Sequence, residues 1–332
     1  MGSGYYDTHT YSTTVGASLR SSGIAGTFAH STATAALPAS LRAAHALLDV
    51  NGVALREARD SDEHPESFPI SVLIDVTGSM ARIPAQITEK LPELNGLLVR
   101  KHYATDPQIM VGGIGDATCD SVPLQISQWE SDNRIDEAIT SLFLEGGGGG
   151  QSTESYELAM YYMARHTETD AYTKRGLRPI LFIIGDEMAY STVSAWCLRE
   201  VLGLPQAESV PTTQIVEELK EKFEVFFIIP RNASNGRREE IVDYWKNFFG
   251  QNVLRPDNVD MLVELIGVQV GLYLGNVDLS SVEADLIDVF GISRDRARSI
   301  ANAVVPVAGS SVAVRGTGDL PVASVVAEPE GF

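Results

Sequence analysis

Strands and helices alternate along the chain from residue 68 onward, and this alternation constrains the fold more than any other feature. Apolar runs rich in β-branched residues occur at 69–76, 178–184 and 224–230. Strands that are apolar at nearly every position are buried on both faces. Successive βα units form a parallel sheet through right-handed crossovers. The sequence therefore predicts an α/β fold with a doubly wound, Rossmann-like, mostly parallel sheet.

The same pattern locates the other elements. Further strands are expected at 108–117 and 253–256, with 124–127 as an antiparallel neighbour. Helical spacing predicts helices over 80–103, 133–144, 152–166, 210–223, 237–249 and 258–274.

An N-terminal extension, residues 1–65, precedes the α/β domain. Residues 1–47 are rich in Ser, Thr and Ala and have little aliphatic periodicity, so they are expected to be disordered alone or ordered only against a partner. Asn51-Gly52 lies between two short apolar runs, which predicts a β-hairpin.

The α/β domain is expected to span residues 66–276. Residues 277–332 then form a C-terminal helical hairpin, with helices at 281–290 and 294–304, and a tail from about 308 that has no helical pattern.

The composition argues against several functional classes. The 25 basic and 44 acidic residues give a net charge of −19, which disfavours nucleic acid and anionic membrane surfaces as partners. The longest apolar stretch, 261–274, is shorter than the roughly 20 residues of a membrane span. With only two cysteines and no apolar segment typical of a secretory signal at the start, we expect a cytoplasmic protein.

Side chains that carry oxygen atoms lie at the ends of two predicted strands and at the start of one predicted helix. Asp75 lies at the end of the strand at 69–76, and Thr77 and Ser79 follow it directly, in a D-x-T-x-S pattern. Ser152 and Thr153 follow five glycines at a helix start, and Asp186 follows the strand at 178–184. Ligands bind at the carboxyl ends of strands in a doubly wound sheet, so these side chains are candidates for one site.

The candidate donors are all hard oxygens, with no His or Cys among them. This set favours Mg²⁺, or Mn²⁺ or Ca²⁺, over zinc and copper. Asp75 and Asp186 are the only two carboxylates in it, so hydroxyls and waters would complete the coordination shell. We expect such a site to leave one position open for a carboxylate from a protein partner.

These residues resemble the metal-ion-dependent adhesion site of the von Willebrand factor type A (VWA) domain, and residues 66–276 resemble that domain as a whole. The resemblance implies that Asp75, Thr77, Ser79, Asp186 and either Ser152 or Thr153 hold the ion. The second loop reads Gln-Ser-Thr-Glu and the third Gly-Asp-Glu, where many relatives read Thr-Pro-Glu and Thr-Asp-Gly.

The resemblance is greatest to prokaryotic and phage intracellular VWA proteins. It implies a non-enzymatic, divalent-cation-dependent protein-binding module, in which a partner Asp or Glu completes the coordination. Because such proteins often work beside AAA+ ATPases, it also implies an adaptor role for an ATPase of that class or for an assembly. The oligomeric state is left open.

Two other functions compete with this interpretation. A structural or assembly protein would dock its neighbours through the N-terminal extension and the C-terminal tail, independently of metal. A metal-dependent phosphohydrolase is suggested by Asp75 at a strand end, which resembles the nucleophile of haloacid-dehalogenase-like enzymes. Those enzymes need a second Asp two residues on, where this chain has Thr77.

Two further features have alternative interpretations. The glycine run at 146–150 lacks the Gly-Lys-Ser/Thr ending of a phosphate-binding loop, so flexibility of the second loop is its expected role. Asp116 follows the strand at 108–117, where it could be a second acid near the metal or a solvated loop residue.

Overall fold

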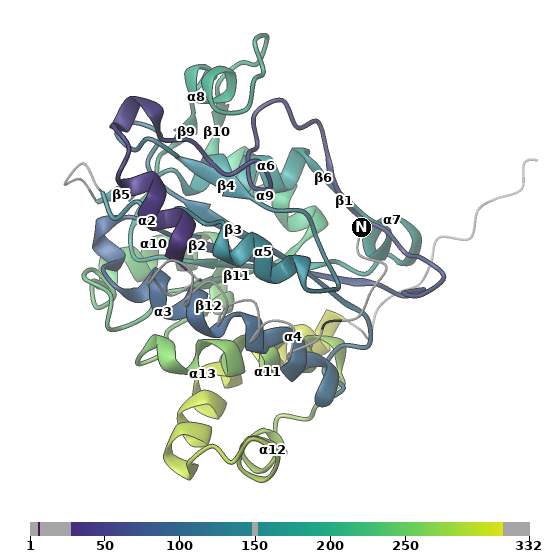
Figure 1. Cartoon of the computed structure of the whole chain (residues 1–332). Coiled ribbons are helices and arrows are strands. Elements are labelled where there is room, and N and C mark those ends of the chain that lie inside the picture. The colour runs from purple at the N-terminus through teal and green to yellow at the C-terminus, as the bar shows by residue number, and fades with distance from the viewer. Residues whose placement is uncertain (1–5, 7–27, 148–151, 315–332) are drawn as a thin grey trace, which may run out of the picture.

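A six-stranded β-sheet forms the centre of the computed structural model, which describes residue 6 and residues 28–147 and 152–314 (Figure 1). From edge to edge the strands are β12 (Val253–Leu254), β11 (Glu224–Ile228), β7 (Ile180–Ile184), β2 (Phe68–Asp75), β3 (Pro107–Ile114) and β4 (Leu124–Ile126). The first five run parallel, and β4 runs antiparallel to β3. This topology confirms the predicted α/β class and the mostly parallel sheet.

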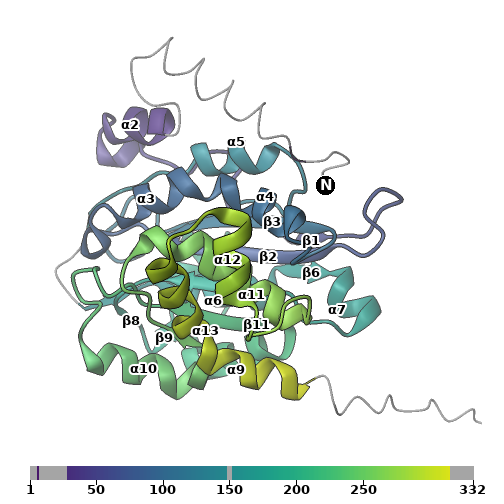
Figure 2. The same cartoon turned by 90° about the horizontal axis from the view of Figure 1, so that it is seen from below.

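Helices cover both faces of the sheet (Figure 1, Figure 2). One face packs against α3 (Ile83–Lys90), α4 (Pro92–Arg100), α5 (Arg134–Thr140), α11 (Leu262–Leu274), α12 (Val282–Phe290) and α13 (Arg294–Val314). The other packs against α6 (Tyr156–Arg165), α8 (Ala195–Glu200), α9 (Thr212–Lys222) and α10 (Glu239–Phe249). In β2, Val72 joins the first core and Leu73 the second, which explains why the strand is apolar at both alternating positions.

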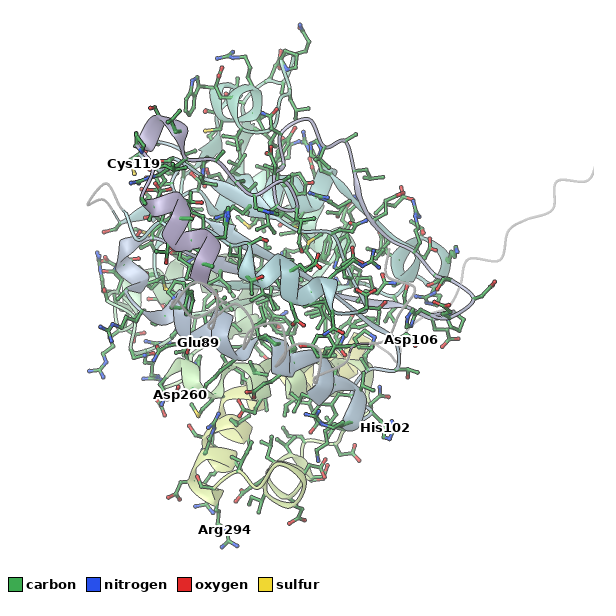
Figure 3. The ribbon with its side chains drawn as sticks, in the orientation of Figure 1. Glu89, His102, Asp106, Cys119, Asp260 and Arg294 are labelled. Atoms are coloured by element: carbon green, nitrogen blue, oxygen red, sulfur yellow. The ribbon has the colours of Figure 1, made fainter. Side chains whose placement is uncertain are left out.

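The direction in which the chain adds strands reverses beside β2. After β2 the chain adds β3 and β4 on one side, and later β7, β11 and β12 on the other. The loops that leave β2 and β7 therefore diverge at the carboxyl ends of these strands, the position at which doubly wound sheets bind ligands. Figure 3 shows the direction in which β3 runs. Asp106 precedes this strand and Cys119 follows it, and the two residues lie on opposite sides of the molecule.

The helix predicted over 80–103 is two helices, α3 and α4, preceded by a 3-10 turn at Gly78–Met80. Pro92 is the first residue of α4. Proline lacks a backbone N–H and its ring clashes with the preceding turn, so one continuous helix cannot pass through this position undisturbed. The predicted helical stretch is therefore present but is divided into two helices at Pro92.

Part of the N-terminal extension folds against the chain itself. Residues 28–47 contain α2 (Ala29–Ala35), and Ser31 Oγ accepts a 3.0 Å hydrogen bond from the Leu144 amide beyond α5. Arg42 lies 3.7 Å from the Glu145 carboxylate. The prediction that residues 1–47 order only against a partner is wrong for 28–47, because these contacts lie within the chain. Residues 1–5 and 7–27 lie outside the described residues.

The hairpin predicted around Asn51-Gly52 is also wrong. A turn does form there, with Gly52 at φ +70°. The strand that follows it, β1 (Arg56–Ala58), instead pairs in parallel with the distant β6 (Thr167–Thr169). A pairing of strands so far apart in sequence leaves no local pattern for sequence analysis to detect.

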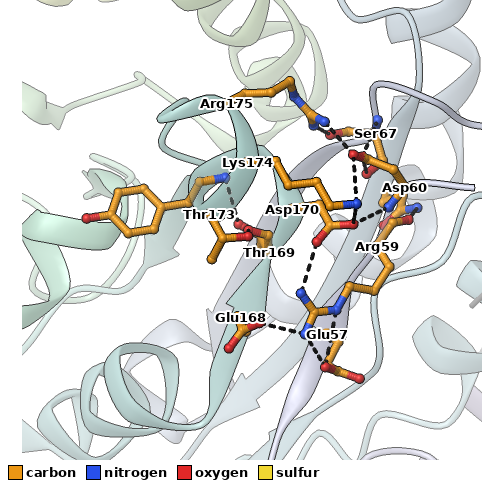
Figure 4. Close-up of polar contacts among 12 residues, drawn as sticks. Glu57, Arg59, Asp60, Ser67, Glu168, Thr169, Asp170, Thr173, Lys174 and Arg175 are labelled. Atoms are coloured by element: carbon orange, nitrogen blue, oxygen red, sulfur yellow. Dashed lines mark hydrogen bonds and ion pairs between the residues drawn. The ribbon is translucent and has the colours of Figure 1, made fainter. Parts of the chain in front are cut away.

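Charged side chains hold β1 and β6 to α7 (Asp170–Arg175), as Figure 4 shows. Arg59 contacts Glu168 at 2.6 Å and Asp170 at 2.9 Å. Lys174 lies 2.7 Å from the other oxygen of Asp170. Burial favours the neutral carboxyl, but the hydrogen bonds from Lys174, the residue 60 amide and Arg59 outweigh it and lower the pKa of Asp170 to about 2.

The C-terminal segment contains the predicted helical hairpin, in which α12 and α13 are separated at Gly291, with φ +62°. Helix α13 runs on to Val314, so the tail predicted from about 308 is helical as far as that residue. Pro306 and Gly309 lower the helix propensity of this stretch, which is why its sequence does not indicate a helix. Residues 315–332 lie outside the described residues.

Two short ribbons complete the structure around the sheet. Strand β5 (Thr153–Glu154) pairs in parallel with β8 (Met188–Ala189), and β9 (Thr192–Val193) pairs antiparallel with β10 (Val210–Pro211). Among the described residues, no helix combines the length and the apolar character needed to cross a bilayer.

Candidate functional site

Two buried carboxylates lie at the carboxyl ends of β2 and β7. Asp75 is the last residue of β2, and Asp186 lies two residues beyond β7. The register of these neighbouring strands pairs Ile74 with Ile184, which brings the two aspartates to the same edge of the sheet. Both have a relative exposure of 0%.

Hydrogen bonds from the two hydroxyls of the D-x-T-x-S loop reach both aspartates. The Thr77 amide and hydroxyl donate to Asp75 Oδ1 at 2.9 and 2.6 Å. Thr77 Oγ1 lies 3.3 Å from Ser79 Oγ, and the Ser79 hydroxyl donates to Asp186 Oδ1 at 2.6 Å. The structure thus brings together four of the six residues predicted from the sequence.

The other two predicted residues, Ser152 and Thr153, make different contacts. Ser152 Oγ accepts a 3.0 Å hydrogen bond from Arg238, which also donates to Asn235 Oδ1 at 3.2 Å. Thr153 lies in β5, and its side chain hydrogen-bonds to the Tyr190 side chain. Ser152 is therefore connected to the site through Arg238 and Asn235, whereas Thr153 contacts Tyr190.

Tyr156, at the start of α6, contributes a contact that the sequence analysis missed. Its hydroxyl donates a hydrogen bond to Asp75 Oδ2, the oxygen not used by Thr77. The ring reaches this position by passing over Gly185, where a Cβ would lie 2.7 Å from ring carbons Cε1 and Cζ. The glycine directly before Asp186 is the only indication of this contact in the sequence, and it does not show which residue packs there.

The loop after β11 also contributes to the site, largely through its backbone. The Asn235 amide donates to Asp186 Oδ2 at 2.7 Å, and the Ser234 amide donates to the Ser79 carbonyl at 3.2 Å. Backbone donors carry no sequence signature. The Asn235-Gly236 pair would have indicated a turn here, but not its contact with Asp186.

The beginning of the glycine run packs directly on the D-x-T-x-S loop. The Gly146 amide donates to the Val76 carbonyl at 3.0 Å, and the Gly78 amide donates to the Gly147 carbonyl. A Cβ on Gly78 would lie 2.8 Å from that carbonyl oxygen, so only glycine fits at position 78. The flexibility predicted for the run concerns mainly residues 148–150, which lie outside the described residues.

Buried acidic side chains cluster at the ends of β2 and β7. Burial raises the pKa of Asp75 to about 7, although hydrogen bonds from Thr77 and Tyr156 oppose the shift, and the charge of Asp186 adds to it. Burial likewise raises the pKa of Asp186, against the hydrogen bonds from Ser79 and the Asn235 amide. Neither carboxylate therefore has enough positive charge nearby to offset the cost of burying its negative charge.

Two glutamates beside the predicted ligands extend this acidic cluster. Burial, a hydrogen bond to Glu187 and the nearby charge of Asp75 raise the pKa of Glu154. Burial also raises the pKa of Glu187, whose Oε1 accepts a 3.1 Å hydrogen bond from Asn235 Nδ2.

Asp116 lies at the same edge of the sheet, two residues beyond β3. Its relative exposure is 0%, and its carboxylate accepts hydrogen bonds from the Thr118 amide at 2.9 Å and the Tyr190 hydroxyl at 3.0 Å. Of the two interpretations considered above, a solvated loop residue is ruled out by this burial. The charge of Asp116 also raises the pKa of Glu154, by less than burial, Glu187 and Asp75 do.

The donor set suits a hard cation better than a transition metal. Within residues 28–147 and 152–314, no three His, Cys, Asp or Glu side chains gather in an arrangement that could hold a metal ion. The cluster of Asp75, Thr77, Ser79 and Asp186 instead offers two carboxylates and two hydroxyls. Oxygen ligands of this kind, completed by water, fit Mg²⁺ or Ca²⁺.

No protein-family model and no curated protein matches the chain. Among solved structures, it is similar to the pilus adhesin SpaC from Lactobacillus rhamnosus GG in its open conformation, with 10% identity and a TM-score of 0.44, over 64% of this chain and 30% of that chain. It is also similar to proximal thread matrix protein 1 from the mussel byssus, with 12% identity and a TM-score of 0.42, over 64% of this chain and 48% of that chain. The chain therefore spans less than half the length of these two proteins. Similarity at this level carries no conclusion about function.

Proposed function

We propose that this chain is a divalent-cation-dependent protein-binding module of the VWA type. The observation that carries the proposal is that Thr77 donates to Asp75 and Ser79 to Asp186, with the two hydroxyl oxygens 3.3 Å apart. These contacts lie where the strand order of the sheet reverses. Mg²⁺, or Mn²⁺ or Ca²⁺, would be held by these four side chains, with Ser152 or Thr153 as the second-loop ligand. The ion would supply positive charge and an open position for a partner's Asp or Glu.

The charge of the site explains why binding would depend on the ion. The chain carries a net charge of −19, and the site itself contains several buried acids. An acidic partner residue would be repelled by such a site. A divalent cation would neutralise the two aspartates and give the partner carboxylate a positive ion to coordinate, and this attraction is strongest where water is excluded.

The contacts of Thr77 favour binding over hydrolysis. Its hydroxyl donates to Asp75, so it orients that carboxylate and offers no acid/base group two residues beyond it. This arrangement supports a non-enzymatic module. We further propose that the partner is a protein, with an AAA+ ATPase or an assembly as the adaptor target.

The proposal is tested by comparing wild type with Thr77→Ala, in Mg²⁺ and in EDTA. Isothermal titration with MgCl₂ alone should show uptake by wild type and at least about tenfold weaker uptake by the variant. Thr88→Ala is the matched control, because Thr88 is an equally buried threonine that donates to the Pro84 carbonyl on α3, outside the site.

Affinity capture with the same proteins then tests the partner. A partner that binds wild type and T88A in Mg²⁺, and is lost both in EDTA and with T77A, supports the proposal. Capture that is indifferent to Mg²⁺ and to T77A would favour a structural role independent of metal.

A further inference from the structure

Three aromatic rings form a cluster directly behind the candidate site. Tyr156 and Trp245 have relative exposures of 0%. Their rings pack edge to face, with 5.4 Å between the ring centroids and an interplanar angle of 87°. The ring of Phe227, on β11, stacks on Trp245 with 3.7 Å between the ring centroids. It also contacts Tyr156, with 5.5 Å between the ring centroids. The cluster joins α6, β11 and α10 in one packed unit.

Each of the two polar aromatic residues contacts one of the strand ends that carry the aspartates. The Tyr156 hydroxyl donates to Asp75 Oδ2, after β2. Trp245 Nε1 donates to the Glu187 carbonyl at 2.8 Å, next to Asp186 and after β7. The edge-to-face contact between the Tyr156 and Trp245 rings therefore connects the end of β2, which carries Asp75, to the loop after β7, which carries Asp186.

We propose that Tyr156 is a positioning residue of the ion site and that Trp245 couples ion binding to α10. This inference rests on the proposed function, because it concerns the same ion. Thr77 fixes one oxygen of Asp75 and Tyr156 fixes the other, so the carboxylate has no freedom to rotate. Without the Tyr156 hydroxyl, one buried oxygen of Asp75 would be unpaired and the carboxylate could turn away from Thr77.

The coupling to α10 follows from the same contacts. Any shift of Asp75 on binding an ion is passed to the Tyr156 ring through the hydrogen bond. Because the ring is enclosed by Phe227, Trp245 and the backbone at Gly185, it cannot move without displacing a neighbour. Trp245 belongs to α10 and is the neighbour that can report this displacement.

Tyr156→Phe tests the positioning role, with Tyr162→Phe as its matched control. Both tyrosines are buried on α6 and both changes remove only a hydroxyl, but Tyr162 stacks on His166, away from Asp75. In calorimetric titration with MgCl₂, Y156F should bind at least about tenfold more weakly than wild type, and Y162F should match wild type. Equal affinity of Y156F and Y162F would overturn the proposal.

Tryptophan fluorescence tests the coupling. Mg²⁺ should change the emission of wild type and of Trp129→Phe, whereas Trp245→Phe should show no change. Trp129 is a fair control because it is also fully buried, with its Nε1 donating to Ser71 Oγ at 3.1 Å. A response that persists in W245F would overturn the coupling to α10.

A metal-free crystal structure of Y156F separates this inference from the proposed function. If wild type takes up no Mg²⁺, the proposed function fails, and the position of Asp75 in that crystal structure still decides the role of Tyr156. An Asp75 carboxylate that turns away from Thr77 supports positioning. A carboxylate that stays in place refutes it.

Discussion

The side-chain hydroxyl of Ser79 donates a 2.6 Å hydrogen bond to Asp186 Oδ1, joining residues 107 positions apart in the sequence. This bond connects the loop after β2 to the loop after β7 across the point where the strand order reverses. Several consequences of this arrangement can be measured without knowing the partner.

Ser79→Ala should weaken Mg²⁺ uptake by about tenfold or more while leaving the fold intact. The change removes the hydroxyl donor to Asp186, but Ser79 is only half-buried, so little packing is lost. Calorimetric titration and circular dichroism would measure the two quantities. Ser234→Ala is the control, because Ser234 is exposed and contacts the site through its backbone amide. An S79A protein with unchanged affinity would contradict the proposed ligand set.

Asp75→Asn should change how stability depends on pH in EDTA. The folded protein holds the Asp75 proton up to about pH 7, whereas the unfolded chain releases it near pH 4. The wild-type free energy of unfolding should therefore fall between about pH 4 and pH 7, by up to ~1.4 kcal/mol per pH unit for this one group. D75N should lack this contribution. Urea unfolding at several pH values would test it, and identical slopes for the two proteins would contradict it.

Gly185→Ala should destabilise the protein by about 1–3 kcal/mol, because overpacking displaces the buried Tyr156 ring. Thermal unfolding of G185A and wild type would measure the loss. The same substitution in a Tyr156→Ala background should cost much less, because the ring that it strikes is gone. If the cost is the same in both backgrounds, the strain arises elsewhere.

Asp170→Asn should destabilise the protein by ~2 kcal/mol at neutral pH, and the difference should disappear in acid. The folded pKa of about 2 lies below the unfolded value near 4, so Asp170 contributes stability above about pH 4 and loses it as the pH falls toward 2. Urea unfolding at pH 7 and near pH 2 would test this. Asp243→Asn, on the exposed side of α10, is the control and should have little effect at either pH.

The sheet could be predicted from the sequence because its strands are buried on both faces. Continuous apolar runs such as Ile180–Ile184 follow directly from that burial. The parallel pairing of β1 with β6 could not be predicted, because it depends on tertiary contacts such as that between Arg59 and Asp170. For the same reason, the docking of α2 beside α5 has no signal in its Ser/Thr/Ala-rich sequence.

The site was predictable only where side chains with a distinctive spacing contribute. Asp75, Thr77 and Ser79 form such a pattern, and the end of β7 pointed to Asp186. The hydroxyl of Tyr156 and the backbone amide of Asn235 complete the surroundings of the two aspartates, and neither has a spacing that would mark it. Whether Ser152 or Thr153 is the second-loop ligand stays a prediction.

Asp75 and Asp186 extend from adjacent strands whose ladder pairs Ile74 with Ile184. Neighbouring strands lie about 4.8 Å apart, so backbone geometry, which varies little with sequence, sets the separation of the two acids. The surrounding loops, such as the one that carries Arg238, do not set that separation. Under the proposed function, substitutions in these loops would change the target while the preference among cations stays the same.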